Sequence, residues 1–293
     1  MDGTFAVVGG EKISMEEFRV NLRVGIRRRF FHGNIPDKEL RSFRRDVADT
    51  LIVNAMLRQE ALRRGLKPDE QWVSKKLKEY EKEYVNEKGF KAQRDQILAS
   101  LRDKLAQDSL VRQLHRRVKE VAAPDTAEVR EYYRQHPDKF TTPEALRVSV
   151  ILLKVDPSSS SSAWRAAEQK AKRLVKRIRQ GDDFEALAYK YSGDRSAQNG
   201  GDLGFVHKGR MAKEAQRVID HLRVGEVSDP VQLLRGITIF RLDEHRPATL
   251  NGFKQVKERA RKLLMRERAK QAWEALRERL RKNTPFTVNE AVL

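Results

Sequence analysis

The sequence predicts an α+β fold in which a mostly helical body carries a smaller mixed β-sheet surrounded by helices. Apolar residues recur at helical spacing through residues 1–120. Between residues 142 and 247 this pattern gives way to β-branched runs and a glycine-rich stretch. A long basic helical pattern then returns before a short terminal strand. Because this part reads as a strand, two helices and two further strands in one mixed sheet, the α+β class is expected.

The first predicted element is a β-hairpin followed by a helix. Its strands are Phe5–Val8 and Glu11–Ser14, and the Gly9-Gly10 pair between them suits a left-handed turn. Ser14 and Glu17 form a capping box, which begins a helix that we expect to run to about Phe31.

Further helices complete the N-terminal part of the chain. Pro36 and Asp37 begin the second of them, Gly65 ends it, and Gly89 is expected to separate the third from the fourth. The predicted ranges are 37–64, 69–86, 91–121 and the shorter 127–135.

The middle of the chain should form the mixed sheet. The expected strands are 146–155, 227–234 and 236–242, and the expected helices are 163–180 and 184–191. Ser158–Ser162 reads as a loop, and Gly200–Gly204 as a series of tight turns without any phosphate-binding pattern.

The predicted helix 251–282 and the strand 285–288 end the sequence. A lone terminal strand and the hairpin at residues 5–14 each need a partner, so we expect them to pair. This pairing would make residues 1–141 and 248–293 one helical body, with residues 142–247 inserted as a second domain. Two domains also agree with the 293-residue length.

The composition limits the possible functions. The net charge is +19 at a pI near 10.1, which could attract nucleic acid, anionic lipid or acidic polypeptide. Opposite charges alternate densely outside residues 142–247, as on solvated helix faces, so no nucleic-acid partner is expected. The absence of cysteine excludes thiol redox chemistry and zinc–thiolate clusters. The six histidines show no metal-ligand spacing, no apolar run reaches membrane-span length and no signal peptide opens the sequence.

Five motifs follow one another in the second half of the sequence, in Ala122–Leu153, Asp183–Ser192, Gly200–Met211, Gly225–Val231 and Gly236–Leu242. In order and spacing they resemble the motifs of the parvulin-type peptidyl-prolyl isomerases of the SurA, PrsA and PpiD extracytoplasmic foldase-chaperone family. The hairpin and helices before them resemble the N-terminal chaperone module of the same family. The resemblance implies a periplasmic or other extracytoplasmic location, with a signal or anchor segment already removed from the chain.

The resemblance also implies a set of site residues. The apolar cup of the family falls at Leu203 and Met211, and its Cys/Asp position falls at Asp194, the candidate catalytic residue. The family histidines are replaced by Val150 and Thr238, and its proline-stacking Phe by Ala215. Leu203 and Met211 could equally be core residues, and Asp194 could be a turn aspartate.

Three functions follow as alternatives. The first is a chaperone with a depleted isomerase site that binds unfolded or nascent secreted and outer-membrane polypeptides, including proline-containing segments, with an anionic membrane surface as a further partner. The second is a working prolyl isomerase that uses Asp194, Leu203 and Met211. The third, suggested by charge alone, is a nucleic-acid-binding protein. None of them requires a cofactor or metal.

Overall fold

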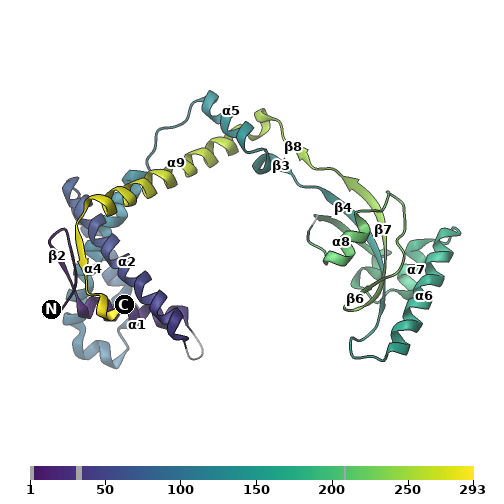
Figure 1. Ribbon diagram of the computed structural model, residues 1–293, viewed down its shortest axis with the longest axis horizontal. Coiled ribbons are helices and arrows are strands. Elements are labelled where there is room, and N and C mark those ends of the chain that lie inside the picture. The colour runs from purple at the N-terminus through teal and green to yellow at the C-terminus, as the bar shows by residue number, and fades with distance from the viewer. Residues whose placement is uncertain (1–2, 31–34, 208) are drawn as a thin grey trace. The chain divides into compact units, whose positions relative to one another are not determined.

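The computed structural model describes residues 3–30, 35–207 and 209–293 (Figure 1). It confirms the α+β class, and the chain divides into two compact units. The first unit comprises Met1–Thr126 and Arg261–Leu293, and the second comprises Ala127–Ala260. The domain boundaries expected from the sequence, after residues 141 and 247, both fall inside the second unit.

The first unit contains a small antiparallel sheet with strand order β2-β1-β9. Its strands are β1 (Thr4–Val8), β2 (Glu11–Ser14) and β9 (Phe286–Val288). Ala6 pairs with Val288 and Val8 with Phe286, which confirms the expected pairing of the hairpin with the terminal strand. The central strand β1 therefore comes from the N-terminal end of the chain, whereas β9, its neighbour on one side, comes from the C-terminal end.

The helices α1 (Met15–Arg29) and α2 (Asp37–Arg63) and the C-terminal part of α9 (Phe253–Asn283) pack against this sheet. The helix α4 (Lys88–Lys119) packs on α2, and α3 (Glu70–Tyr84) packs on α4. Ser14 accepts a hydrogen bond from the Glu17 backbone N–H at 3.0 Å, as the capping box predicts. The predicted helix end at Phe31 lies outside the described residues. Gly89 does not separate helices as expected, because it lies in the first turn of α4, where a missing side chain costs little.

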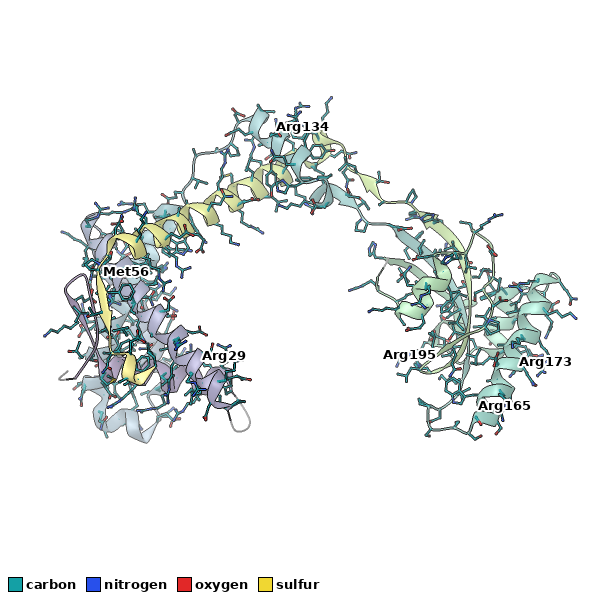
Figure 2. All side chains as sticks on the ribbon, in the orientation of Figure 1. Arg29, Met56, Arg134, Arg165, Arg173 and Arg195 are labelled. Atoms are coloured by element: carbon teal, nitrogen blue, oxygen red, sulfur yellow. The ribbon has the colours of Figure 1, made fainter. Side chains whose placement is uncertain are left out.

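The core of the first unit is apolar and closely packed. The Phe5 and Phe18 rings stack with centroids 4.1 Å apart, which joins the sheet to α1. Met56 on α2 (labelled in Figure 2) is 1% exposed and belongs to the same buried cluster as these two rings. Leu114 of α4 and Leu276 of α9 are buried in a second cluster against α2. Burial of this apolar surface supplies the main stabilising term of the unit.

One buried carboxylate joins α2 to α9. Glu60 is 4% exposed. It accepts hydrogen bonds from Arg63 and Arg64 of its own helix at 2.7 and 2.8 Å, and from Arg279 of α9 at 3.0 Å. The hydrogen bond from Arg63, opposed by burial and assisted by Arg64, lowers the pKa of Glu60 below its usual value. The carboxylate is therefore charged and fully partnered near neutral pH.

The second unit is built on an antiparallel sheet with strand order β5-β4-β7-β6. The strands are β4 (Ala145–Lys154), β5 (Asp202–His207), β6 (Val231–Leu233) and β7 (Gly236–Arg246). The helices α6 (Ser161–Arg179) and α7 (Phe184–Tyr191) pack on one face, and α8 (Lys213–Ile219) packs on the other. The unit also contains α5 (Thr126–Gln135), the short helices η1 (Pro137–Phe140) and η2 (Arg195–Asn199), the start of α9, and the short strands β3 (Thr141–Thr142) and β8 (Thr249–Leu250).

The structure corrects three expectations for this unit. The strand expected at 227–234 is only Val231–Leu233, because Pro230 has no N–H for the ladder and Val227 makes a single isolated bridge. The glycine-rich stretch contains the strand β5, whose residues pair with β4 beyond the turns at Gly200 and Gly201. The helix α8 was not predicted, because its short apolar pattern follows Met211 without a capping residue.

Candidate functional site

The floor of the candidate site is formed by the two central strands of the second unit. Val150 pairs with Phe240, and Leu152 pairs with Thr238. Successive side chains of a strand point to opposite faces, so these four side chains share the face that α8 partly covers. The alternate residues, such as Ile151 and Ile239, contribute to the core beneath α6 and α7.

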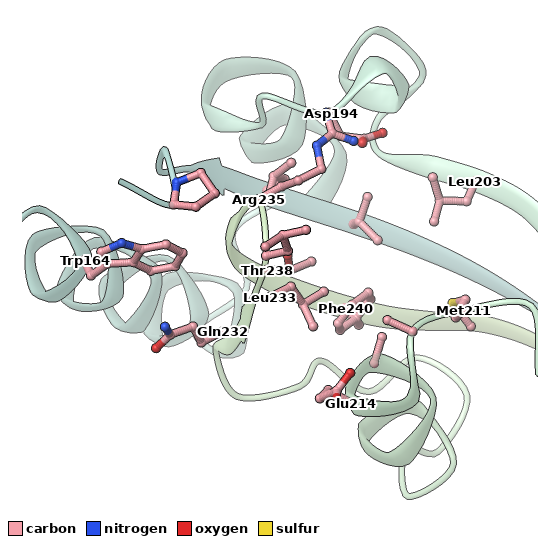
Figure 3. A pocket seen from close by; sticks show the side chains of 16 residues that line it. Trp164, Asp194, Leu203, Met211, Glu214, Gln232, Leu233, Arg235, Thr238 and Phe240 are labelled. Carbon is pink, nitrogen blue, oxygen red and sulfur yellow. The ribbon is translucent and has the colours of Figure 1, made fainter. Parts of the chain in front are cut away.

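All six residues expected from the sequence line one pocket of about 700 Å³ on this face. Figure 3 shows Leu203 and Met211 at one end of the pocket, with Phe240 and Thr238 along its floor. Leu203 is 40% exposed, whereas Val150, Ala215 and Thr238 are buried in the floor and wall. The six are Val150, Asp194, Leu203, Met211, Ala215 and Thr238.

A glycine brings β5 into position beside β4. Gly201 has φ +87°, and a Cβ added there would lie 2.5 Å from the Val150 carbonyl oxygen. The Gly201 carbonyl accepts a hydrogen bond from the Val150 N–H at 2.9 Å. This close approach, which only glycine allows, places Leu203 on the rim two residues later.

Asp194 lies at the rim and caps the short helix η2 (Arg195–Asn199). Its Oδ1 accepts hydrogen bonds from the Ser196 N–H at 3.0 Å and from the Ser196 hydroxyl at 2.8 Å. Burial alone would raise the pKa of Asp194, but the hydrogen bonds from Ser196 and the positive charges of Arg235 and Lys154 together lower it. The carboxylate is therefore ionised at neutral pH, and one of its oxygens has a structural role.

The hairpin tip between β6 and β7 closes the other end of the pocket. Gly236 has φ +137°, and a Cβ there would lie 2.1 Å from the Leu153 carbonyl oxygen. The Arg235 carbonyl accepts a hydrogen bond from Val155 at 3.2 Å, which fixes the tip against the end of β4. The tip carries Leu234, which is 78% exposed although it lines the pocket.

The chemistry available in the pocket is mainly apolar contact. The positions of the two family histidines carry a valine and a threonine, so no imidazole lies at either position to tune Asp194. Within the described part of the chain, no group of His, Asp and Glu side chains could hold a metal ion.

Sequence reasoning missed other pocket residues. Phe240 could have been found, because it lies two residues after Thr238 on the same strand face. Trp164, from the first turn of α6, gave no such signal, because its placement depends on how the helix packs against the sheet. The pocket thus keeps two aromatic side chains although Ala215 replaces the expected phenylalanine.

Two family models match the chain. The PPIC-type PPIase domain model matches residues 151–244, and the SurA-like N-terminal domain model matches residues 1–120. Among curated relatives, the foldase protein PrsA of Caldanaerobacter subterraneus is 29% identical over 265 residues, covering 86% of this chain and 76% of that protein. The chaperone SurA of Pseudomonas aeruginosa is 33% identical over 138 residues, covering 47% of this chain and 33% of that protein.

Solved structures give similar matches. A SurA-like chaperone structure from Campylobacter jejuni aligns with a TM-score of 0.45 at 20% identity, covering 95% of this chain and 97% of that one. A PrsA structure from Bacillus cereus aligns with a TM-score of 0.34 at 22% identity, covering 94% of this chain and 90% of that one.

Proposed function

Since this chain belongs to the SurA- and PrsA-like family of chaperone-foldases with a PPIC-type domain, we propose that its pocket binds proline-containing segments of unfolded polypeptides with little or no catalysis of prolyl isomerisation. The observation that carries the proposal is the make-up of the pocket. It keeps the apolar cup of Leu203 and Met211 but has valine and threonine at the two histidine positions.

The apolar lining favours binding of a proline ring. Covering a proline ring removes roughly 100 Å² of apolar surface from water, which is worth about 2.5 kcal/mol before the costs of association. Met211, Ala215 and Phe240 belong to one apolar cluster with Val150, so the cup is supported by the core beneath it. A preformed cup loses little conformational freedom when a chain enters.

Catalysis has a further requirement. Prolyl rotation crosses a barrier of roughly 18–20 kcal/mol because the twisted amide loses its resonance. An enzyme must bind the twisted form better than either planar form, with polar groups placed where charge develops. The acidic side chains that line this pocket are Asp194, which caps η2, and Glu214 of α8, and neither occupies a family histidine position. Binding without substantial acceleration follows from this arrangement.

An active prolyl isomerase is the second candidate. The ionised carboxylate of Asp194 at the rim and the positive charge of Arg235 near it favour this alternative. In that case Asp194 would act on the carbonyl or amide of the bound prolyl bond, and Leu203 and Met211 would hold the ring.

The cellular setting is part of the proposal. We place the protein outside the cytoplasm, acting on secreted or outer-membrane polypeptides, because its sequence is similar to the foldase protein PrsA and the chaperone SurA and shares the motifs of that extracytoplasmic foldase-chaperone family. Among the described residues no helix is long and apolar enough to cross a bilayer. An anionic membrane surface remains a proposed partner, on the basis of the +19 net charge.

The deciding experiment measures the cis-to-trans rate of Ala-X-Pro-Phe peptides, with X being Glu, Leu or Lys, in the presence and absence of the protein. We expect no acceleration for any X, together with suppressed aggregation of an unfolded client. A rate that Asp194→Ala abolishes would establish the isomerase instead. Asp194→Asn serves as the control, because it keeps an oxygen able to cap η2 while removing the charge.

A further inference from the structure

The pocket extends beyond the positions that the family motifs define. Pro157, Trp164, Gln232 and Leu234 also line it, and none of them belongs to the expected set of site residues. They come from the segment after β4, from the first turn of α6, from β6 and from the tip of the β6–β7 hairpin. This part of the pocket is defined here as the Trp164 end.

The Trp164 end is a structured surface. Ser160 caps α6 through a hydrogen bond from the Ala163 N–H, at 3.4 Å, which holds the first turn that carries Trp164. The indole is half-buried and packs against the core beneath α6, so one side of it is supported. The opposite wall is the hairpin tip that Gly236 fixes against Leu153.

The residue pairs in the pocket floor lead from the proline cup toward the Trp164 end with the spacing of an extended peptide. The pair Val150–Phe240 lies beside Met211 and Ala215, and the pair Leu152–Thr238 is one step further along the strands. Figure 3 shows Thr238 and Leu233 between Met211 and Trp164. Residues two apart on a strand are about 7 Å apart. An extended peptide with its proline in the cup therefore carries the side chain two residues away toward the Trp164 end.

The chemistry of this end favours an uncharged, flat side chain. Its walls are the indole, a proline ring and leucine side chains, and its polar member, Gln232, is neutral. The neighbouring cation Arg235, at the hairpin tip, lies near the Asp194 carboxylate (Figure 3). Aromatic side chains gain from ring contacts beyond their burial. Trp164 and Gln232 also border an adjoining hollow of about 390 Å³, which leaves space on a second side of the indole.

We propose that the Trp164 end is a second subsite, which takes an aromatic side chain two residues from the bound proline and makes Trp164 a specificity-determining residue. This inference rests on the proposed binding of proline-containing segments in the same pocket. The expected occupant is an extended stretch of unfolded polypeptide in which a proline and a Phe, Tyr or Trp are separated by one residue.

The test uses three dye-labelled peptides and the full chain. One peptide has alanine around a central proline, the second has tyrosine two residues before the proline, and the third has it two residues after. Fluorescence anisotropy gives each Kd. We expect one tyrosine peptide to bind roughly 3- to 10-fold more tightly than the alanine peptide. Trp164→Ala should abolish this gain, and Trp164→Phe should keep most of it.

Controls separate this inference from the function on which it rests. Met211→Ala should weaken all three peptides by a similar factor, because it alters the proline cup. If it does so while neither tyrosine improves binding, the pocket proposal stands and the second subsite is wrong. A gain that survives Trp164→Ala also overturns the subsite. Absence of binding by every peptide overturns both proposals.

Two further measurements guard against a folding artefact. Thermal melting followed by circular dichroism establishes that each variant is folded, and Trp164→Leu, which keeps an apolar side chain against the core, should also lose the tyrosine gain.

In a Trp72→Phe, Trp273→Phe background, Trp164 is the sole tryptophan, because the chain has three. Its emission should change with the tyrosine peptide and not with the alanine peptide. Unchanged emission with both would overturn the subsite.

Discussion

At the scale of single residues, the carboxylates of Asp194 and Glu60 have different roles in this protein. Asp194 divides its carboxylate between capping η2 and facing a pocket. Glu60 is committed wholly to structure, because three arginines surround it. A buried charge is tolerated where all of its hydrogen bonds are met, and it is expensive where they are not. The fully partnered Glu60 therefore allows a quantitative prediction.

We predict that Glu60→Gln lowers the free energy of unfolding at neutral pH by about 2–3 kcal/mol, because it removes charge-assisted hydrogen bonds from a buried site. The folded-state pKa of Glu60 is lowered, so its stabilisation is present above the unfolded pKa and is lost as pH falls through the folded value. Urea unfolding near pH 7 and near pH 3 should therefore show a difference between wild type and variant that shrinks in acid. Glu79→Gln, at an exposed pair with Lys76, is the control and should change little. A difference that grows in acid would contradict this assignment.

At the scale of elements, the β6–β7 hairpin and the terminal strand β9 have the clearest roles. The hairpin tip forms one wall of the pocket and is fixed by the backbone contact at Gly236. The strand β9 completes the sheet of the first unit and covers part of its core through Val288. Both elements are short, so their positions depend on a few contacts each.

Substitution of Gly236 by alanine should destabilise the protein by more than about 3 kcal/mol, because the new Cβ would meet the Leu153 carbonyl oxygen as well as adopt a strained φ. Gly225→Ala is a matched control, since Gly225 also has a positive φ of +85° but has no atom within 4 Å of an added Cβ. It should cost about 1–2 kcal/mol. Thermal or urea unfolding measures both, and equal losses would mean that the close contact is not what fixes the hairpin.

Introducing a charge on β9 should reveal its contribution to the core. Val288→Asp places a carboxylate against the apolar cluster around Phe5 and should cost about 2–3 kcal/mol. Thr287→Asp puts the same charge on an exposed neighbour of the same strand and should cost less than about 1 kcal/mol. Urea unfolding followed by circular dichroism compares the stability of the two variants. A larger loss of stability for Thr287→Asp would mean that Thr287, and not Val288, faces the core.

At the scale of the whole molecule, the sequence predicted the class and most helices but not every element. Long helices such as α2 have enough periodic apolar residues to be identified without a structure. The strand β5 was missed because the glycines that allow its approach to β4 also hide its alternating pattern. The six candidate site residues, which line one pocket, could be named from family spacing, whereas Trp164 could not, because its place in the pocket arises from packing between distant segments.

The net charge of +19 should control how quickly clients are captured. Acidic unfolded clients should associate at least about 10-fold faster at 0.05 M than at 0.5 M salt, because screening shortens the range of the field. A client of the same length with lysines in place of its acidic residues is the control and should not slow with salt. Stopped-flow fluorescence measures both rates. Random-sequence DNA that binds more tightly than either client would favour the nucleic-acid alternative.

The pairing of β1 with β9 also governs when the first unit can finish folding. On a chain that is synthesised or exported from its N-terminus, the hairpin emerges early, whereas its last partner follows roughly 280 residues later. During that interval one edge of β1 lacks its β9 partner and the cluster around Phe5 lacks the contribution of Val288. During folding, this protein therefore exposes an open strand edge and apolar surface of the kind that unfolded clients present. At that stage it needs protection itself, before it can protect its clients.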